Sequence, residues 1–156
     1  MSKGVYSLFI ELCKDKPIRL RSGLQLYIEK GYYIYTGSAF GEGSASLERR
    51  IGRHLVPNKK RFWHIDYLLD GDGVVLEAVF SPTKKRMECE VNKRICLLLG
   101  AQPIKGFGSS DCKQGCLGHL LHHKSYGEKD AIDAIWKAYS TLELEPKNLG
   151  MQIGYR

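Results

Sequence analysis

The first third of the sequence strongly favours β-strands. Residues 5–12 (VYSLFIEL) and residues 32–36 (YYIYT) are rich in aliphatic, β-branched and aromatic side chains, and a Gly- and Ser-rich stretch, SAFGEGSAS, follows the second segment. Shorter strands are predicted between them at residues 18–21 and, from the alternation of apolar side chains, at residues 24–28. We expect these strands to be antiparallel neighbours.

Helical periodicity begins after this strand-rich part. Leu47, Ile51 and Leu55 recur at helical spacing, Ser46 is a suitable N-cap, and Pro57 ends the pattern. The remaining predicted elements are helices at residues 62–69, 86–99 and 131–139, and a strand at residues 74–80. This order predicts an α+β fold, a small and mainly antiparallel sheet flanked by helices with an additional C-terminal helix.

Length and hydropathy limit the kind of protein further. A chain of 156 residues with 43% apolar side chains suits one globular domain. Its longest apolar runs are shorter than the roughly 18 residues of a membrane span, and its first residues do not resemble a secretory signal, so a cytoplasmic protein is expected.

Positive charge is concentrated in one segment. The formal net charge is +7, and residues 49–61 (RRIGRHLVPNKKR) contain no acidic side chain. The segment predicts phosphate contacts with a nucleic acid, although a solvated basic surface would look the same in composition. Its cations are Arg49, Arg50, Arg53, Lys59, Lys60 and Arg61.

Three short motifs occur in a characteristic order. They are Gly4-Val5-Tyr6 on the first strand, Tyr35-Thr36-Gly37 on the second, and an L-x-x-R pattern from Leu47 to Arg50 on the helix. In this order they resemble the GIY-YIG nuclease superfamily. The strings YIYTGSAFG, RHL, WHIDYLL and GFGSSDC resemble an uncharacterised branch of it, whose members are sometimes fused to endonuclease III-like repair enzymes.

The resemblance implies one GIY-YIG-like domain and a function. Its core spans about residues 4–100, and a Cys- and His-bearing extension with the C-terminal helix spans about residues 101–156. The implied activity is metal-dependent hydrolysis of phosphodiester bonds in DNA, in repair or processing, with one Mg²⁺ or Mn²⁺ ion as cofactor. DNA, branched or damaged, is the expected partner, and a repair enzyme is a further candidate.

The catalytic assignments follow from matching positions. Tyr6 and Tyr35 correspond to the motif tyrosines, and Arg50 corresponds to the arginine that contacts the phosphate. Arg53 and His54 lie three and four residues further along the same helix, where they can assist phosphate binding or proton transfer. A tyrosine is a poor base unless cations lower its pKa, so a nearby arginine or a metal-bound water is part of the requirement.

The metal ligand is a choice between two glutamates. Glu88 shares a helical face with the apolar stripe of Val91, Ile95 and Leu98, which is expected to be buried, and a carboxylate at the edge of a buried face favours a bound cation. Glu90 points about 200° away, but Glu90-Val91-Asn92 resembles the E-x-N pattern of the superfamily. Glu88 is the preferred ligand and Glu90 the alternative.

A second group of metal-ligand types follows GFGSSDC. Cys112, Cys116 and His119, with His122 or His123, have the spacing C-x3-C-x2-H-x3-H, which could hold one zinc ion. We expect buried thiols and a helix with exposed histidines instead, without stoichiometric zinc. The remaining cysteines are expected to be plain thiols in or near the core: Cys13, Cys89 and Cys96.

Other readings remain open at this point. The tyrosines could be ordinary sheet residues, and the protein could be a nucleic-acid-binding module without cleavage activity, or an interaction domain that guides a repair glycosylase. His64 and Asp66 could orient a site residue. The two motif tyrosines are further apart in sequence than is usual in the superfamily, so residues 17–30 are expected to form an inserted strand or hairpin.

Overall fold

The computed structural model describes residues 3–20, 22–41, 46–56, 64–108, 115–123 and 127–148. The elements in chain order are β1 (Gly4–Leu12), β2 (Lys16–Arg19), β3 (Gln25–Ile28), β4 (Gly31–Ala39), α1 (Leu47–His54), α2 (His64–Leu69), β5 (Gly73–Pro82), α3 (Glu88–Leu99), β6 (Gln102–Pro103), β7 (Leu120–His123), α4 (Glu128–Thr141) and β8 (Lys147–Asn148). Within these ranges, no helix combines the length and the apolar character that crossing a membrane requires.

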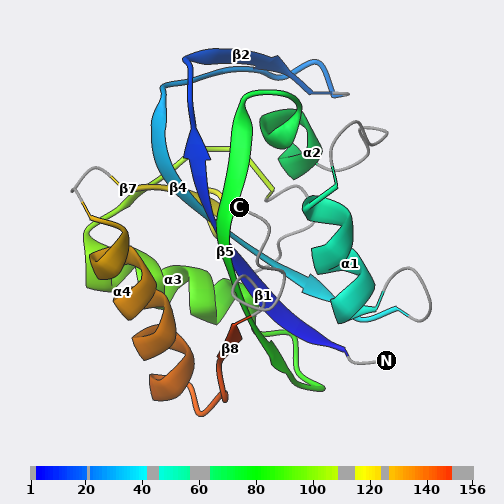
Figure 1. Cartoon of the computed structure of the whole chain (residues 1–156), viewed down its shortest axis with the longest axis vertical. Helices are drawn as coiled ribbons and strands as arrows, with labels where there is room; N and C mark the ends of the chain where they lie inside the picture. The colour runs from blue at the N-terminus through cyan, green and yellow to red at the C-terminus, as the bar shows by residue number, and fades with distance from the viewer. Residues whose placement is uncertain are drawn as a thin grey trace.

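A six-stranded antiparallel sheet forms the centre of the fold. The strand order is β6-β7-β4-β1-β5-β8, so β1 pairs with β4 on one side and with β5 on the other. Helices α1 and α2 cover one face of the sheet, and α3 and α4 cover the opposite face (Figure 1). The predicted α+β fold with a C-terminal helix is confirmed.

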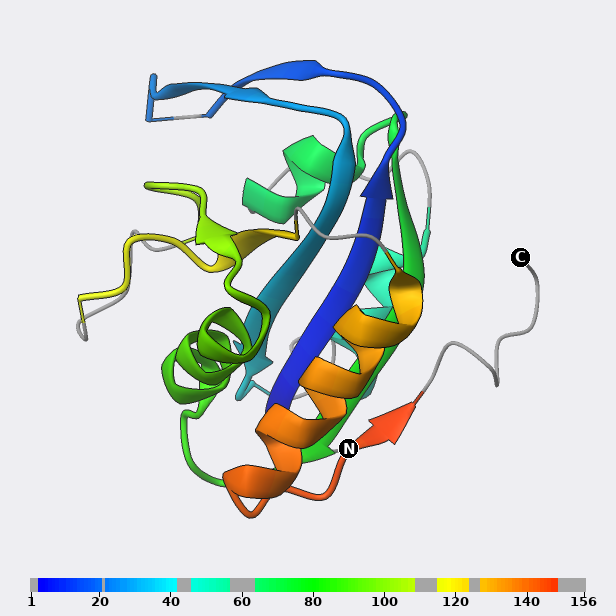
Figure 2. The same ribbon diagram turned by 90° about the vertical axis from the view of Figure 1, so that its left-hand side faces the viewer.

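The two layers of helices explain the composition of β1. Alternate residues of a strand point to opposite faces, and both faces of β1 are covered. Leu8 and Ile10 join the core under α1 and α2, whereas Val5 and Phe9 join the core under α3 and α4. The strand is therefore apolar almost throughout. Figure 2 shows α4 lying along the sheet on the second face.

The segment between β1 and β4 forms a hairpin, as the sequence predicted. Strands β2 and β3 pair with each other as a separate two-stranded sheet. Lys16 fastens this hairpin to the turn before β5, because its ammonium group donates to the carbonyl of Asp70 and lies 3.8 Å from the carboxylate of Asp72.

The helices agree with the sequence patterns except at a few positions. Helix α1 begins at Leu47 as expected but ends at His54, whereas Pro57 lies outside the described residues. Helix α3 begins at Glu88 and ends at Leu99, and its C-cap is Gly100, which has a φ of 63° in the left-handed region. Leu98, expected in the buried stripe of α3, is 38% exposed.

Two strand predictions were incomplete. Strand β4 continues through residues 37–39, which the sequence suggested as loop, because they pair with residues 4–6 of β1. Strand β7 was not predicted, although it adds Leu120 and Leu121 to the cores on the two faces and pairs with β4. Its four residues are too few to establish a clear alternation. Strands β6 and β8 have two residues each.

Candidate functional site

The two motif tyrosines lie on the face of the sheet that α1 covers. Tyr6 pairs across the strands with Gly37, and Tyr35 lies two residues before Gly37 on the same strand, so both tyrosines point to one side. Their ring centroids are 6.3 Å apart. The Tyr6 hydroxyl and Nε2 of His54 form a hydrogen bond of 2.8 Å, and the Tyr35 ring lies 6.4 Å from the His54 ring in an edge-on arrangement.

The glycines of both motifs are required by close contacts. A Cβ atom at Gly37 would lie 2.8 Å from the Tyr6 hydroxyl oxygen and 3.1 Å from Cε2 of Tyr35. At Gly4, a Cβ atom would collide with the carbonyl oxygen of Ser81 on β5. A larger residue at Gly37 would therefore displace the tyrosines, and one at Gly4 would separate β1 from β5.

Both phenols stay protonated in this environment. Burial raises the pKa of Tyr6 well above its ordinary value, and the nearby Tyr35 raises it further, although the charge of Arg50 lowers it. Burial also raises the pKa of Tyr35 to about 12, with Arg50 again opposing the shift and with Asp66 and Glu88 adding to it. At neutral pH the two tyrosines are therefore hydrogen-bond donors rather than bases.

The arginines of helix α1 have different partners. Nη1 of Arg50 donates to the carbonyl oxygen of Ser38 at 2.9 Å, which fixes the guanidinium beside the end of β4. Nη1 of Arg53 lies 2.7 Å from Oδ1 of Asp66, a fully buried carboxylate on α2, so this arginine compensates an internal charge. Arg49 is exposed. The sequence suggested no pairing of Arg53 with Asp66.

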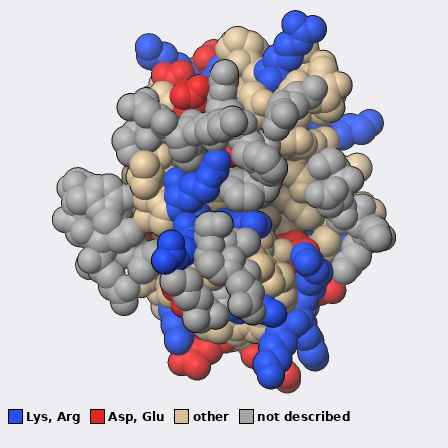
Figure 3. Space-filling view, turned by 90° about the vertical axis from the view of Figure 1, so that its right-hand side faces the viewer, with Lys and Arg blue, Asp and Glu red and all other residues tan. Residues whose placement is uncertain are grey.

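Basic side chains lie on the surface that carries α1 and α2. Figure 3 shows one group of Lys and Arg side chains in the middle of this face and further ones along its edges, where most of the visible acidic side chains also lie. The second half of the predicted basic segment lies outside the described residues: Lys59, Lys60 and Arg61.

Residues of the loop before β7 pack against the Tyr35 ring. The Phe107 ring packs edge-on against Tyr35, at 6.3 Å between centroids, and Gly108 lies close enough that an added Cβ would approach Tyr35 to 3.2 Å. The backbone N–H of Gly108 donates to Nδ1 of His64 at 2.7 Å. His64 thus orients the loop that contacts Tyr35. The GFG string was the sequence signal for this loop.

The two candidate glutamates lie in the first turn of α3. The start of this helix is beside the end of β4, because the guanidinium of Arg86 lies 4.7 Å from the ring of Phe40. Burial lowers the pKa of His119 and the charge of Glu88 opposes this shift, while the same charge adds to the burial that raises the pKa of Tyr35, so the carboxylate lies near both side chains. Oε2 of Glu88 and Oε2 of Glu90 are buried, and neither has a hydrogen-bond partner within the described residues.

The predicted Cys and His group is only partly assembled. Cys116 and His119 come together, but their third neighbour is Cys89 of α3, which the sequence suggested as a plain core thiol. The ligand-type atoms of these three residues all lie within 4.8 Å of one another. Cys112 lies outside the described residues.

The other two predicted histidines, His122 and His123, do not join this group. His122 stacks on Tyr33, with ring centroids 4.6 Å apart, and His123 lines a pocket with Leu99 of α3 and Asp133 of α4. The expectation of a helix with exposed histidines is wrong, because residues 120–123 form strand β7 and the His123 side chain is buried. The alternation of a strand sends these two histidines to opposite faces.

The fold and the site together define an α+β protein in which adjacent antiparallel strands and one helix join two tyrosines, a histidine and an arginine. The chain belongs to the family described as domain of unknown function DUF123, whose model matches residues 5–143. This match extends from β1 to just beyond α4. Neither among curated proteins nor among solved structures is there a significant match.

Proposed function

We propose that this protein is a metal-dependent endonuclease of the GIY-YIG superfamily that hydrolyses phosphodiester bonds in DNA. The observation that carries the proposal is the Tyr6–His54 hydrogen bond beside Tyr35. Arg50 and Glu88 both act on the pKa of Tyr35, so their charges lie within electrostatic reach of this cluster. A core that served packing alone would have no need of so many polar and ionisable groups at one place.

The side chains have chemically distinct roles in the proposed reaction. Hydrolysis of a phosphodiester places negative charge on the phosphate oxygens and requires a positioned water that loses a proton. Arg50 stabilises that charge, and the protonated phenol of Tyr35 donates a hydrogen bond to the phosphate or the water. The Tyr6 hydroxyl, which is bonded to Nε2 of His54, takes the proton of the water as it passes its own proton to the imidazole. His54 accepts the proton, since imidazole is the side chain best suited to proton transfer near neutral pH.

A divalent ion is part of the proposal. Glu88 fits Mg²⁺ or Mn²⁺, because these ions prefer carboxylate oxygens and its buried Oε2 has no partner within the described ranges. Glu90 remains the alternative ligand for the same reason. Such an ion, when bound, supplies positive charge near the leaving oxygen.

DNA is the proposed substrate because of the charge around α1. The face that carries the tyrosine cluster is also the face on which basic side chains gather. Backbone contacts of this kind give affinity without sequence preference, which suits an enzyme that acts on branched or damaged DNA in repair or processing. A repair enzyme is the proposed protein partner.

The test is cleavage of supercoiled, flapped and abasic DNA with Mg²⁺ or Mn²⁺. Wild-type protein should cut at least one of these substrates, and Glu88→Gln and Arg50→Ala should each lower the rate by about 100-fold or more while DNA binding persists. Glu90→Gln is the matched control, because it makes the same chemical change two residues away, and it should cleave as wild type does.

The alternatives give different results in the same experiment. If Glu90→Gln is inactive and Glu88→Gln cleaves normally, the metal ligand is Glu90. If wild type binds DNA but cleaves no substrate with either ion, the protein is a binding module that keeps the fold without the reaction.

A further inference from the structure

Three residues with strong metal-binding chemistry converge at the start of α3. Cys89 lies in the first turn of the helix, Cys116 lies in the loop before β7, and His119 immediately precedes that strand. Cys89 and His119 are buried, at 4% and 6% exposure, and Cys116 is partly exposed. The Sγ atom of Cys89 and Nε2 of His119 are 3.6 Å apart.

These distances suit one tetrahedral ion. With a zinc–sulfur distance of about 2.3 Å and a zinc–nitrogen distance of about 2.0–2.1 Å, tetrahedral geometry places a thiolate and an imidazole nitrogen about 3.6 Å apart and two thiolates about 3.8 Å apart. The observed sulfur–nitrogen distance equals the first value. All three ligand-type atoms lie within 4.8 Å of one another, so small side-chain adjustments bring them around a common centre.

The backbone of this loop is held firmly enough to present ligands. Nδ2 of Asn92, one turn further along α3 than Glu88, donates to the carbonyl oxygen of Gly118 at 2.9 Å. The N–H of His119 donates to the carbonyl of Phe107, and the N–H of Gly106 donates to the carbonyl of Leu117. Such supporting hydrogen bonds are typical around metal ligands, because they orient the donors before the ion binds.

The donor set selects the kind of ion. Two thiolates and a neutral imidazole are soft or intermediate donors, which zinc prefers and which Mg²⁺ and Mn²⁺ do not. From the spacing of Cys116 and His119 alone, buried thiols were the better expectation. The third ligand comes from Cys89, which is 27 residues before Cys116 and meets it only through the fold.

We propose that Cys89, Cys116 and His119 bind one zinc ion that fastens the loop before β7 to the start of α3. The loop also carries Phe107 and Gly108, which support Tyr35, so the ion stabilises one wall of the tyrosine cluster. The proposal does not depend on any reaction at that cluster, because its ligands are different residues and its readout is metal content.

The test is elemental analysis of protein purified without chelators from zinc-supplemented cells. Wild type should carry one zinc per chain, and Cys89→Ser, Cys116→Ser and His119→Ala should each lose most of it. Cys96→Ser and Cys13→Ser are the controls, because Cys96 is on the same helix with its thiol directed at the carbonyl of Ala101 and Cys13 is exposed, and both should retain the ion. Cobalt substitution should give the sulfur-to-metal absorption band in wild type and not in Cys116→Ser.

A thermal measurement guards against variants that simply misfold. Chelator should lower the Tm of wild type, and added zinc should restore it, whereas the Tm of Cys116→Ser should not respond to either. Cys116 lies outside all helices and strands, so this substitution leaves the cores intact. A metal-free wild type with no cobalt band, or full zinc retention in Cys89→Ser and Cys116→Ser, would overturn the proposal.

Discussion

The two faces of the central sheet each bury a tyrosine hydroxyl, but they surround it differently. On the α1 face, the Tyr6 hydroxyl is hydrogen-bonded to His54, and Arg50 and Asp66 influence its pKa. On the α4 face, the Tyr139 hydroxyl is hydrogen-bonded to Ser7 at 3.0 Å. Ser7 follows Tyr6 in the chain, so one strand serves both environments.

The difference lies in the charge of the partners. Ser7 also bonds to Thr36 at 2.8 Å, so the hydroxyl network on the α4 face is neutral and its members bond to one another. Neutral networks of this kind satisfy buried polar groups and fix the packing of a helix on a sheet. The Tyr6 cluster instead removes ionisable groups from water. This lowers the stability of the fold, so the presence of these groups indicates a role other than packing. The comparison therefore distinguishes Tyr139, a structural tyrosine, from Tyr6, the tyrosine proposed to take part in the reaction.

The largest effect is expected when the hydroxyl of Tyr6 or of Tyr139 is removed, which tests whether the two tyrosines have different roles. Tyr6→Phe should lower DNA cleavage by about 100-fold or more, because the hydroxyl that bonds to His54 and passes the proton to it is lost. Tyr139→Phe should leave cleavage unchanged and lower the free energy of unfolding by about 1–2 kcal/mol, since it removes the neutral hydrogen bonds to Ser7 and to the carbonyl of Val79. Steady-state kinetics measure the cleavage rates of both variants, and urea unfolding measures their free energies of unfolding. Equal cleavage by the two variants would break the comparison.

Two glycine substitutions test how tightly the α1 face is built. Gly37→Ala should lower the free energy of unfolding by about 1–3 kcal/mol, because the new Cβ would lie 2.8 Å from the Tyr6 hydroxyl. Gly52→Ala on α1 makes the same change where no described atom lies within 4 Å, and it should raise stability by about 0.5–1 kcal/mol. Thermal unfolding gives both values. A neutral Gly37→Ala would mean that the tyrosines move aside at little cost.

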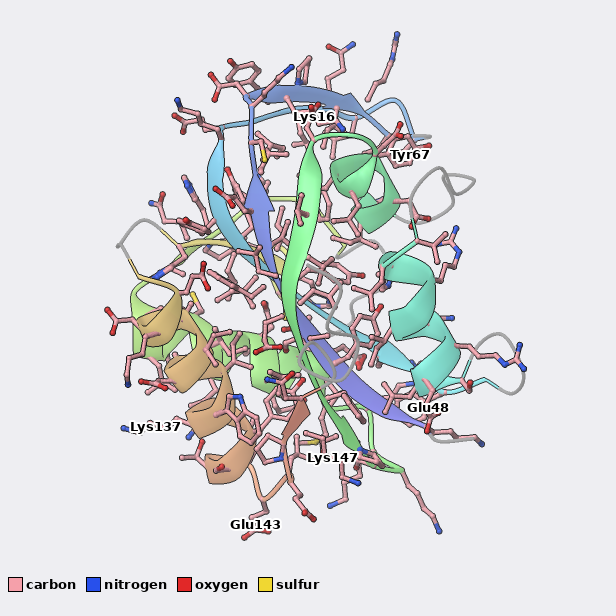
Figure 4. All side chains as sticks on the ribbon, viewed as in Figure 1. Lys16, Glu48, Tyr67, Lys137, Glu143 and Lys147 are labelled. Atoms are coloured by element: carbon pink, nitrogen blue, oxygen red, sulfur yellow. The ribbon has the colours of Figure 1, made fainter. Side chains whose placement is uncertain are left out.

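The smallest expected effect compares exposed cations on the two faces. Arg49 lies on α1, and Lys137 lies on α4 across the sheet, where Figure 4 labels it. Arg49→Ala should lower the salt dependence of DNA binding by about one unit in the slope of log K against log salt, because one phosphate contact is lost. Lys137→Ala should leave slope and affinity unchanged. Fluorescence anisotropy at several salt concentrations checks this, and equal slopes for both variants would place DNA elsewhere.

Local patterns in the sequence determined most of the fold. Leu47 and Ile51 at helical spacing predicted α1, and the apolar run of β1 predicted a strand, because these signals depend on neighbours a few residues away. Strand β7 was not predicted, because its two leucines and two histidines do not alternate in polarity along the chain. Only its pairing with β4 places successive side chains on opposite faces of the sheet.

The sequence by itself also identified Tyr6, Tyr35 and Arg50 as candidates, because short motifs in a fixed order are local information. Only the tertiary structure decided which residues meet: that Arg53 is paired with buried Asp66, and that Cys116 has Cys89 rather than His123 as its neighbour. The physical reason is that contacts between α1 and α2, or between α3 and the loop before β7, depend on how helices pack on the two faces of a sheet. No spacing along the chain encodes that packing.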